Sequence, residues 1–165
     1  MAITSHNPAA IARPLFLYGT LRAMPLLAWA LTGDSRKIDV VEPLVKPAEV
    51  RGYARFSLHG KDYPALVKYA DTSAVDGLLL YPQSKSERRK LDDFEGEAYV
   101  VTPVQVSVVG DKDWTVDADI YLWNGDSDMV SKDPWCLQTF IDERLDDWIE
   151  LFAGMELVGD EEDTQ

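Results

Sequence analysis

The 165-residue sequence contains few residues of the types that bind transition metals or form disulfides. There is one cysteine, Cys136, and there are two histidines, His6 and His59. A single cysteine excludes an intrachain disulfide, and these three residues form no set of ligands at zinc spacing. His59 lies in a predicted turn and is not beside a nucleophile-elbow motif, so a Ser-His-Asp triad is not indicated. The sequence also lacks a Walker loop and a G-x-G-x-x-G motif, so we expect no nucleotide, no metal and no other cofactor.

Basic residues are scarce relative to acidic ones, with 16 Lys and Arg against 29 Asp and Glu, which gives a net charge of −13. Because no basic stripe with interleaved aromatics is present, we expect neither nucleic acid nor an anionic membrane as a partner. Ten of the acids and a single base, Arg144, fall within residues 142–165. We interpret this end as a solvated helix face followed by an acidic disordered tail over residues 158–165.

Long hydrophobic runs are absent too, and no stretch approaches the length needed to span a bilayer. Residues 1–12 lack the basic start and apolar run of a secretory signal, so we expect a cytoplasmic protein. The length suits one domain, and the 46% of hydrophobic residues suffices for a core without a disulfide or metal. We therefore predict a loose N-terminal arm over residues 1–14, a single domain over residues 15–157, and the acidic tail.

Turn residues divide the chain into short elements with recognisable periodicity. Apolar runs and alternation predict strands and extended segments, which cover residues 15–18, 50–58, 63–69, 75–81, 99–109 and 114–123. Apolar spacing and capping residues predict helices over residues 25–31, 84–94 and 135–152. At the start of the second helix, Ser84 and Glu87 have the spacing of a capping box. Pro43 and Pro47 are expected to break regular structure. This order indicates an α+β fold, a small mixed, mostly antiparallel β-barrel or sheet with flanking helices.

The first segment that suggests chemistry is Leu17-Tyr18-Gly19-Thr20-Leu21-Arg22. A strand that ends in glycine lets the backbone adopt a positive φ and lets a ligand approach the main chain closely. Successive N–H groups in such a turn can form an anion-binding nest. Because a glycine after a strand is more often simply a turn, this segment alone leaves both interpretations open.

The second segment is Leu91-Asp92-Asp93-Phe94-Glu95-Gly96-Glu97-Ala98-Tyr99, where we expect a helix to end at Gly96. The helix macrodipole disfavours carboxylates in the last turn, yet Asp92, Asp93 and Glu95 all lie there. A neighbouring negative field also raises the pKa of a carboxyl group toward the range of a general base. The simpler alternative is that all three carboxylates are solvated and are partly offset by the basic residues just before them.

Taken together, a strand ending in Tyr-Gly-Thr-Leu and a later Leu-Asp-x-Phe-Glu-Gly-x-x-Tyr resemble the γ-glutamyl cyclotransferase-like family. Shorter motifs add support, namely Gly52-Tyr53-Ala54-Arg55-Phe56-Ser57, Tyr63-Pro64-Ala65, Val75-Asp76-Gly77 and Asp117-Ala118-Asp119-Ile120-Tyr121-Leu122-Trp123. The order of motifs is most similar to the plant and fungal "avirulence-induced gene"-like branch. The resemblance covers residues 15–152.

This resemblance implies a small β-barrel enzyme that converts a small-molecule γ-glutamyl amide to 5-oxoproline and a free amine, without a metal or other cofactor. It implies that Glu95 is the catalytic glutamate and that the turn is the substrate loop. The candidate substrate-binding residues are Tyr18, Gly19, Thr20, Leu21, Arg22 and Tyr99. Thr20 stands where many members have serine, which keeps a small hydroxyl group. The leaving amine and the oligomeric state are left open.

Three other functions are considered: a non-catalytic binding module of the same fold, an enzyme that acts on the γ-glutamyl bond of a larger conjugate, and an acidic interaction protein. Several residues near the motifs have simpler interpretations. Tyr63 and Tyr121 are expected to be packing residues with a hydrogen-bonded tip, and Arg55 a surface residue. Trp135 and Trp148 are expected to lie in the core.

Overall fold

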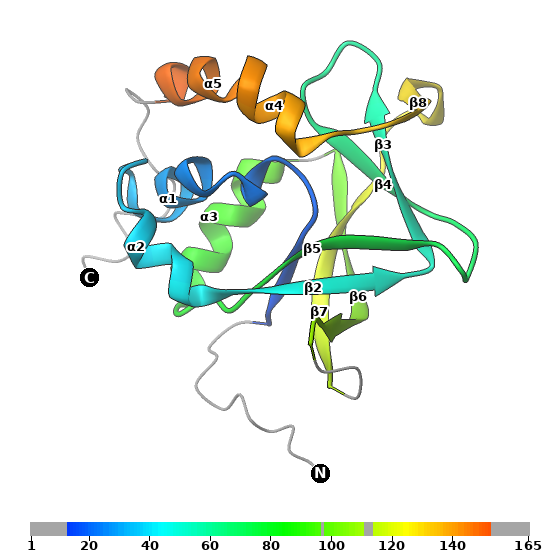
Figure 1. The fold of residues 1–165 in the computed structure, drawn as a ribbon, viewed down its shortest axis with the longest axis horizontal. Coiled ribbons are helices and arrows are strands. Elements are labelled where there is room, and N and C mark those ends of the chain that lie inside the picture. Colours follow the sequence, from blue (N-terminus) through cyan, green and yellow to red (C-terminus); the bar gives the residue numbers. More distant parts are fainter. Residues whose placement is uncertain (1–12, 97, 111–113, 153–165) are drawn as a thin grey trace.

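A computed structural model describes residues 13–96, 98–110 and 114–152 of the protein. Its centre is a closed five-stranded barrel in the order β1-β5-β2-β6-β7 (Figure 1). The strands are β1 Leu15–Leu17, β2 Val45–Arg51, β5 Ala74–Leu80, β6 Tyr99–Val108 and β7 Thr115–Trp123. Neighbouring strands pair antiparallel, apart from β1 and β7, whose parallel pairing closes the barrel. The predicted α+β fold with a mostly antiparallel barrel is confirmed.

A second sheet of three strands, in the order β4-β3-β8, lies beside one end of the barrel (Figure 1). Its strands are β3 Tyr53–Leu58, β4 Pro64–Lys68 and β8 Val130–Pro134. The predicted single strand over residues 50–58 is wrong, because Gly52 adopts a φ of 86° and divides β2 from β3. The predicted break at Pro47 is also wrong. Since β2 pairs with β6 only at Ala48 and Glu49, Pro47 lies beyond the end of that ladder, where its missing N–H is tolerated.

The helices lie on one side of the barrel and across one end of it (Figure 1). The α-helices are α1 Met24–Thr32, α2 Ile38–Val41, α3 Lys85–Glu95, α4 Leu137–Glu143 and α5 Leu145–Phe152, and three short 3-10 helices are η2 Thr20–Arg22, η3 Glu42–Leu44 and η4 Ser127–Met129. In the described part of the chain, no helix has both the length and the apolar composition needed to cross a bilayer.

The predicted helix over residues 135–152 is shorter than expected and is interrupted. It begins at Leu137, and Arg144 leaves the helical conformation with a φ of −126°. The amide of Arg144 still bonds to the carbonyl of Phe140, and the amide of Trp148 to the carbonyl of Arg144. Helical spacing therefore continues across the interruption, which is why the apolar pattern does not reveal it.

The core is continuous from the barrel interior to α1. Leu15, Leu79 and Ile120 of the barrel strands are fully buried, as are Leu26 and Leu27 of α1. Because the α1 sequence is apolar on nearly every side, the helix is buried almost all round rather than along one stripe. Each such buried side chain contributes about 1.5–3 kcal/mol of hydrophobic stabilisation.

The segment that leads into β1 is attached to β7. The guanidinium Nε of Arg13 lies 2.9 Å from Oδ1 of Asp119, and the amide of Asp119 bonds to the carbonyl of Pro14 at 2.9 Å. Arg13 and Pro14 are the last two residues of the predicted N-terminal arm. Residues 1–12 and 153–165 lie outside the described residues. The predicted domain boundaries therefore stay a prediction.

Gly77 marks the closest approach between β1 and β5, and it provides a test of the barrel. A Cβ atom at this position would lie 2.2 Å from the carbonyl oxygen of Leu17 and 2.7 Å from the ring of Phe16. We expect Gly77→Ala to force the two strands apart and to cost about 1–3 kcal/mol, or roughly 2–4 °C in Tm per kcal/mol. Gly60→Ala is the control, because its Cβ would meet nothing within 4 Å and only a φ of 73° is strained. Thermal unfolding of both variants checks this, and equal Tm losses would contradict the steric account.

Candidate active site

The helix α3 is capped at both ends as its sequence predicts. The side chain of Ser84 accepts a hydrogen bond from the amide of Glu87 at 3.0 Å, and Oε1 of Glu87 accepts one from the amide of Gln83 at 2.8 Å. This capping box fixes where the helix begins. At the other end Gly96 adopts a φ of 79°, and its amide bonds to the carbonyl of Asp92. Glu95 is therefore the last residue of α3.

Glu95 lines two hollows at the open end of the barrel. One is a cavity of about 650 Å³ between α1, α3, α5 and the loop after β3. The other is a small recess of about 10 Å³, formed with the turn that contains Gly19, Thr20 and Leu21. The structure thus brings Glu95 and this turn together, although the sequence separates them widely.

The carboxyl group of Glu95 is enclosed by protein, while the residue as a whole is partly exposed because it faces the cavity. Burial, together with the nearby charge of Asp92, raises its pKa to about 8. No hydrogen bond to this carboxyl group comes from the described residues. The alternative of three solvated carboxylates is therefore wrong for Glu95. A carboxyl group with this pKa can both accept and donate a proton near neutral pH.

Three tyrosines surround Glu95, and each donates its hydroxyl hydrogen elsewhere. Tyr18 donates to the carbonyl of Tyr121, Tyr99 to the carbonyl of Pro64 at 2.7 Å, and Tyr121 to Oδ1 of Asp92 at 2.7 Å. Burial and the neighbouring acidic groups raise the pKa of all three hydroxyls, so they stay un-ionised. They form a wall of low polarity. The sequence predicted that Tyr121 is a packing residue with a hydrogen-bonded tip, and that tip donates to Asp92.

The turn differs from its predicted form at Gly19. Its φ is −122°, so it does not need the positive φ that the sequence suggested. Glycine is favoured here because a Cβ would lie 3.0 Å from the ring of Pro64, closer than an ordinary contact. The amides of Thr20 and Leu21, in the first turn of η2, have no acceptor within the described ranges. Both residues are buried and line the small recess.

Arg22 and Arg55 both bind the carbonyl of Tyr18 and the carboxylate of Asp76, and so support the turn. Arg22 forms an ion pair with Asp76 at 3.2 Å, and Arg55 forms one with the same carboxylate at 2.7 Å. Arg55 also donates to the carbonyl of Tyr18 at 3.0 Å. Neither arginine lines the cavity or the recess. The structure therefore places Arg22 away from Glu95, in a position that supports the turn.

The cavity is walled on one side by α5, which is bound to the loop between β3 and β4 through Asp62. The Asp62 carboxylate accepts hydrogen bonds from Nε1 of Trp148 and Nε of Arg144, both at 2.9 Å. Its carbonyl accepts one from Nε1 of Trp135 at 2.7 Å. Partial burial opposes ionisation of Asp62, but these hydrogen bonds hold its pKa below the usual value. Trp135 is buried as predicted, whereas Trp148 lines the cavity because the inward face of α5 meets an open space.

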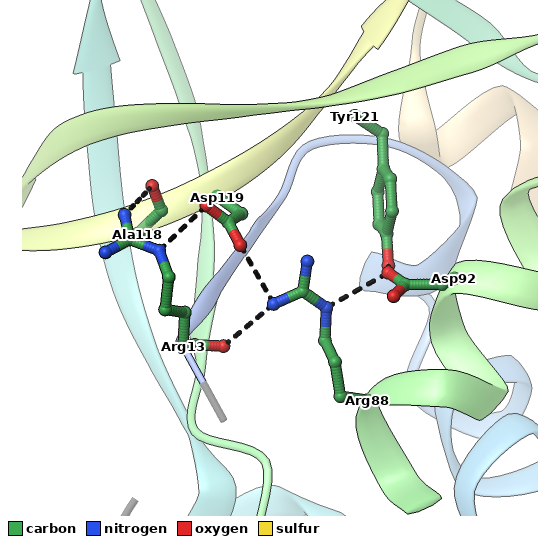
Figure 2. Close-up of polar contacts among 6 residues, drawn as sticks. All are labelled: Arg13, Arg88, Asp92, Ala118, Asp119 and Tyr121. Atoms are coloured by element: carbon green, nitrogen blue, oxygen red, sulfur yellow. Dashed lines mark hydrogen bonds and ion pairs between the residues drawn. The ribbon is translucent and has the colours of Figure 1, made fainter. Parts of the chain in front are cut away.

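A chain of ion pairs connects α3 to β7 and to the segment before β1 (Figure 2). Nε of Arg88 lies 3.0 Å from Oδ1 of Asp92, and Nη1 of Arg88 lies 2.9 Å from Oδ2 of Asp119. Asp119 also binds Arg13, and Asp92 accepts the hydroxyl of Tyr121 (Figure 2). The side chains of Arg88 and Asp119 are only 14% and 9% exposed. The sequence missed this cluster, although the i, i+4 spacing of Arg88 and Asp92 was a signal for part of it.

Within residues 13–96, 98–110 and 114–152, no group of three or more His, Cys, Asp or Glu side chains is arranged to hold a metal ion.

The raised pKa of Glu95 predicts a pH-dependent stability. The pKa is about 8 in the folded protein against 4.5 ordinarily, so between these values the unfolded chain ionises while the folded protein keeps its proton. The free energy of unfolding should therefore fall as pH rises through this range. Glu95→Gln removes the titration, so its Tm advantage over the native protein should grow between about pH 5 and 8 and then level off. Glu143→Gln, an exposed change on α4, is the control for thermal unfolding. A constant difference for Glu95→Gln would contradict the assignment.

The ion-pair chain predicts a large loss of stability when its central cation is removed. Arg88→Met keeps the apolar stem but leaves Asp92 and Asp119 without this partner. Removing one member of a buried pair costs about 3–5 kcal/mol, so we expect a Tm lower by roughly 6–20 °C at 2–4 °C per kcal/mol. Lys85→Met, on the exposed first turn of the same helix, should change Tm little. Similar Tm values for Arg88→Met and Lys85→Met would show that the ion pairs do not hold the helix.

The chain is similar in sequence and in fold to known proteins. The sequence profile described as "Gamma-glutamyl cyclotransferase, AIG2-like" matches residues 15–137. The chain is 28% identical to Protein AIG2 C of Arabidopsis thaliana over 153 residues, which are 93% of this chain and 86% of that protein.

Two solution structures of Arabidopsis thaliana proteins share the fold. One gives a TM-score of 0.60 at 22% identity and covers 91% of this chain and 93% of its own. The other gives a TM-score of 0.58 at 24% identity and covers 87% of this chain and 81% of its own. Because the profile matches well over half of the sequence, the chain belongs to the γ-glutamyl cyclotransferase, AIG2-like family.

Proposed function

We propose that this protein is a γ-glutamyl cyclotransferase, which cyclises the γ-glutamyl group of a small amide to 5-oxoproline and releases the amine. The observation that supports this most directly is the enclosed carboxyl group of Glu95, whose pKa is about 8 and which faces a cavity beside the turn of Thr20 and Leu21. Membership of the family supports the same reaction.

In the proposed mechanism, Glu95 moves one proton between two nitrogen atoms. The α-amino nitrogen of the substrate attacks its own γ-carbonyl carbon, while the Glu95 carboxylate removes a proton from that nitrogen. A new C–N bond closes the five-membered ring, and the carbonyl oxygen becomes an oxyanion. Protonated Glu95 then gives the proton to the leaving nitrogen, the amide C–N bond breaks, and 5-oxoproline and the amine separate. Because nucleophile and carbonyl belong to one molecule, the main task is to fold the substrate into a reactive geometry.

The turn supplies polar groups for this geometry. We propose that the amides of Thr20 and Leu21 bind a substrate oxygen, either of the carboxylate or of the developing oxyanion. The recess that they line, about 10 Å³, has room for about one water-sized group, which suits a single oxygen. Tyr18 and Gly19 also line that recess, whereas Tyr99 lines the larger cavity. Arg22 acts on the substrate only through the position of the turn.

The enclosed position of Glu95 favours an enzyme over a binding module. Burial raises the free energy of an ionised carboxyl group. A protein that only binds its ligand gains nothing from this cost, whereas a general acid-base catalyst uses the raised pKa. Turnover of a γ-glutamyl amide distinguishes an enzyme from a binding module. Larger γ-glutamyl conjugates in the same substrate panel test for a tailoring enzyme.

We expect the native protein to release 5-oxoproline from one or more γ-glutamyl amides, and Glu95→Gln to lower kcat by about 10²–10⁴-fold, since general acid-base catalysis contributes that much. Glu143→Gln makes the same chemical change at an exposed position on α4 outside the cavity and should leave kcat unchanged. The release of 5-oxoproline is measured by chromatography. Equal rates for the native protein and Glu95→Gln would refute the role of Glu95, and binding without any turnover would favour the binding module.

A further inference from the structure

The cavity that opens from Glu95 is larger than the reacting group of the substrate requires. Its volume of about 650 Å³ lies within the range of sites that hold a complete drug-sized ligand. The recess and the larger cavity share Glu95 and Thr20 in their linings, and the larger cavity is also lined by residues of α1 and α5. If the γ-glutamyl group reacts at Glu95, the amine part of the amide occupies the larger cavity.

Six of the residues that line the larger cavity are aromatic, and their rings contact one another. Trp29 stacks on Phe152 with 5.0 Å between ring centroids, and Phe152 meets Trp148 edge to face at 5.8 Å. Trp148 in turn meets Tyr63 at 6.3 Å, and Phe94 lies 5.8 Å from Phe152. Aromatic side chains arranged at these distances and angles favour an additional ring among them.

The charged groups of the cavity are unfavourable for a second negative group. Besides Glu95, the lining includes three carboxylates, Asp62, Asp93 and Asp147, and two cations, Lys90 and Arg144.

Both cations already have partners. Arg144 binds Asp62 at 2.9 Å and Asp147 at 2.8 Å. Lys90 is buried and donates to the carbonyl of Leu31 at 3.4 Å. A carboxylate on the leaving amine would therefore meet three other carboxylates and two cations that are already engaged, which is unfavourable.

We propose that this cavity selects γ-glutamyl amides of arylalkylamines that carry no carboxylate, in preference to γ-glutamyl amino acids and peptides. The inference deepens the proposed function and rests on it. The amide bond that breaks joins the γ-carbonyl carbon to the nitrogen of the arylalkylamine. The proton from the α-amino group passes through Glu95 to that nitrogen, so the products are 5-oxoproline and a neutral arylalkylamine.

Three synthetic amides test separately the two substrate features that the cavity is proposed to select, an aromatic ring and the absence of a second carboxylate. γ-Glutamyl-phenethylamide has the ring and no second carboxylate, γ-glutamyl-phenylalanine has the same ring and one added carboxylate, and γ-glutamyl-propylamide has neither. With the native protein we expect kcat/KM for the phenethylamide to exceed both others by at least about tenfold. A kcat/KM for γ-glutamyl-phenylalanine that equals or exceeds that of the phenethylamide would overturn the proposal, as would equal values for the phenethylamide and propylamide.

A charge variant tests whether the engaged state of Arg144 causes the discrimination. Asp147→Asn removes one of its two carboxylate partners, and the Asp147 side chain is 62% exposed, so the fold should tolerate the change. We expect the kcat/KM ratio of γ-glutamyl-phenylalanine to phenethylamide to rise at least threefold. Asp146→Asn is the matched control, because Asp146 is the exposed neighbour on α5 and does not line the cavity. An unchanged ratio in Asp147→Asn would refute the charge account.

Binding to Glu95→Gln separates a failure of this proposal from a failure of the proposed function. The affinity of that variant for the same three amides can be followed by calorimetry and by the fluorescence of Trp29 and Trp148. If no amide turns over but the phenethylamide binds about tenfold more tightly than γ-glutamyl-phenylalanine, the cyclotransferase proposal fails and the cavity's selectivity stands. If no amide turns over and the two bind equally, or neither binds, the selectivity is refuted together with the function.

Discussion

The position of Arg88 between two carboxylates is the interaction on which the rest of the site depends. Its guanidinium group binds Asp92 on its own helix and Asp119 on β7, and its side chain is only 14% exposed. A cation buried in this way is stable only while both partners keep their places, because an unpaired buried charge is costly. The helix α3 therefore has one favourable position against the barrel. That position determines where its last residue, Glu95, meets the turn of β1 (Figure 1).

The end of α3 combines features that a helix with a purely structural role would avoid. The Glu95 carboxyl group is enclosed, lies at the negative end of the helix macrodipole, and is close to the charge of Asp92. Tyr121 donates a hydrogen bond to the Asp92 carboxylate, and Arg88 forms an ion pair with it. Proteins tolerate such local conflicts mainly at functional sites, and the result here is a carboxyl group that titrates near the pH at which it would work.

The sequence was informative where a feature depends on neighbours in the chain and misleading where it depends on distant ones. The capping box that begins at Ser84 and the helix end at Glu95 are local, and both were predicted. Gly19 was identified as special for the wrong reason, because only the fold brings Pro64 against it. Likewise, the apolar stripe shows that Trp148 faces inward, but whether the inward space is core or cavity depends on the separation of α5 from the barrel. The pairing of Arg88 with Asp119 also requires the fold.

Asp62 binds both Trp148, which belongs to the aromatic wall of the cavity, and the cation Arg144. The same carboxylate that holds Trp148 in the wall also binds Arg144, so the contact that fixes the aromatic surface engages the cation beside it. Specificity can come from withholding a favourable partner as well as from providing one. An unengaged cation at this position would require Asp62 to release Arg144, which would loosen α5 and the ring of Trp148 with it. In the proposed selectivity, the position of Trp148 in the aromatic wall and the engagement of Arg144 therefore both depend on the Asp62 carboxylate.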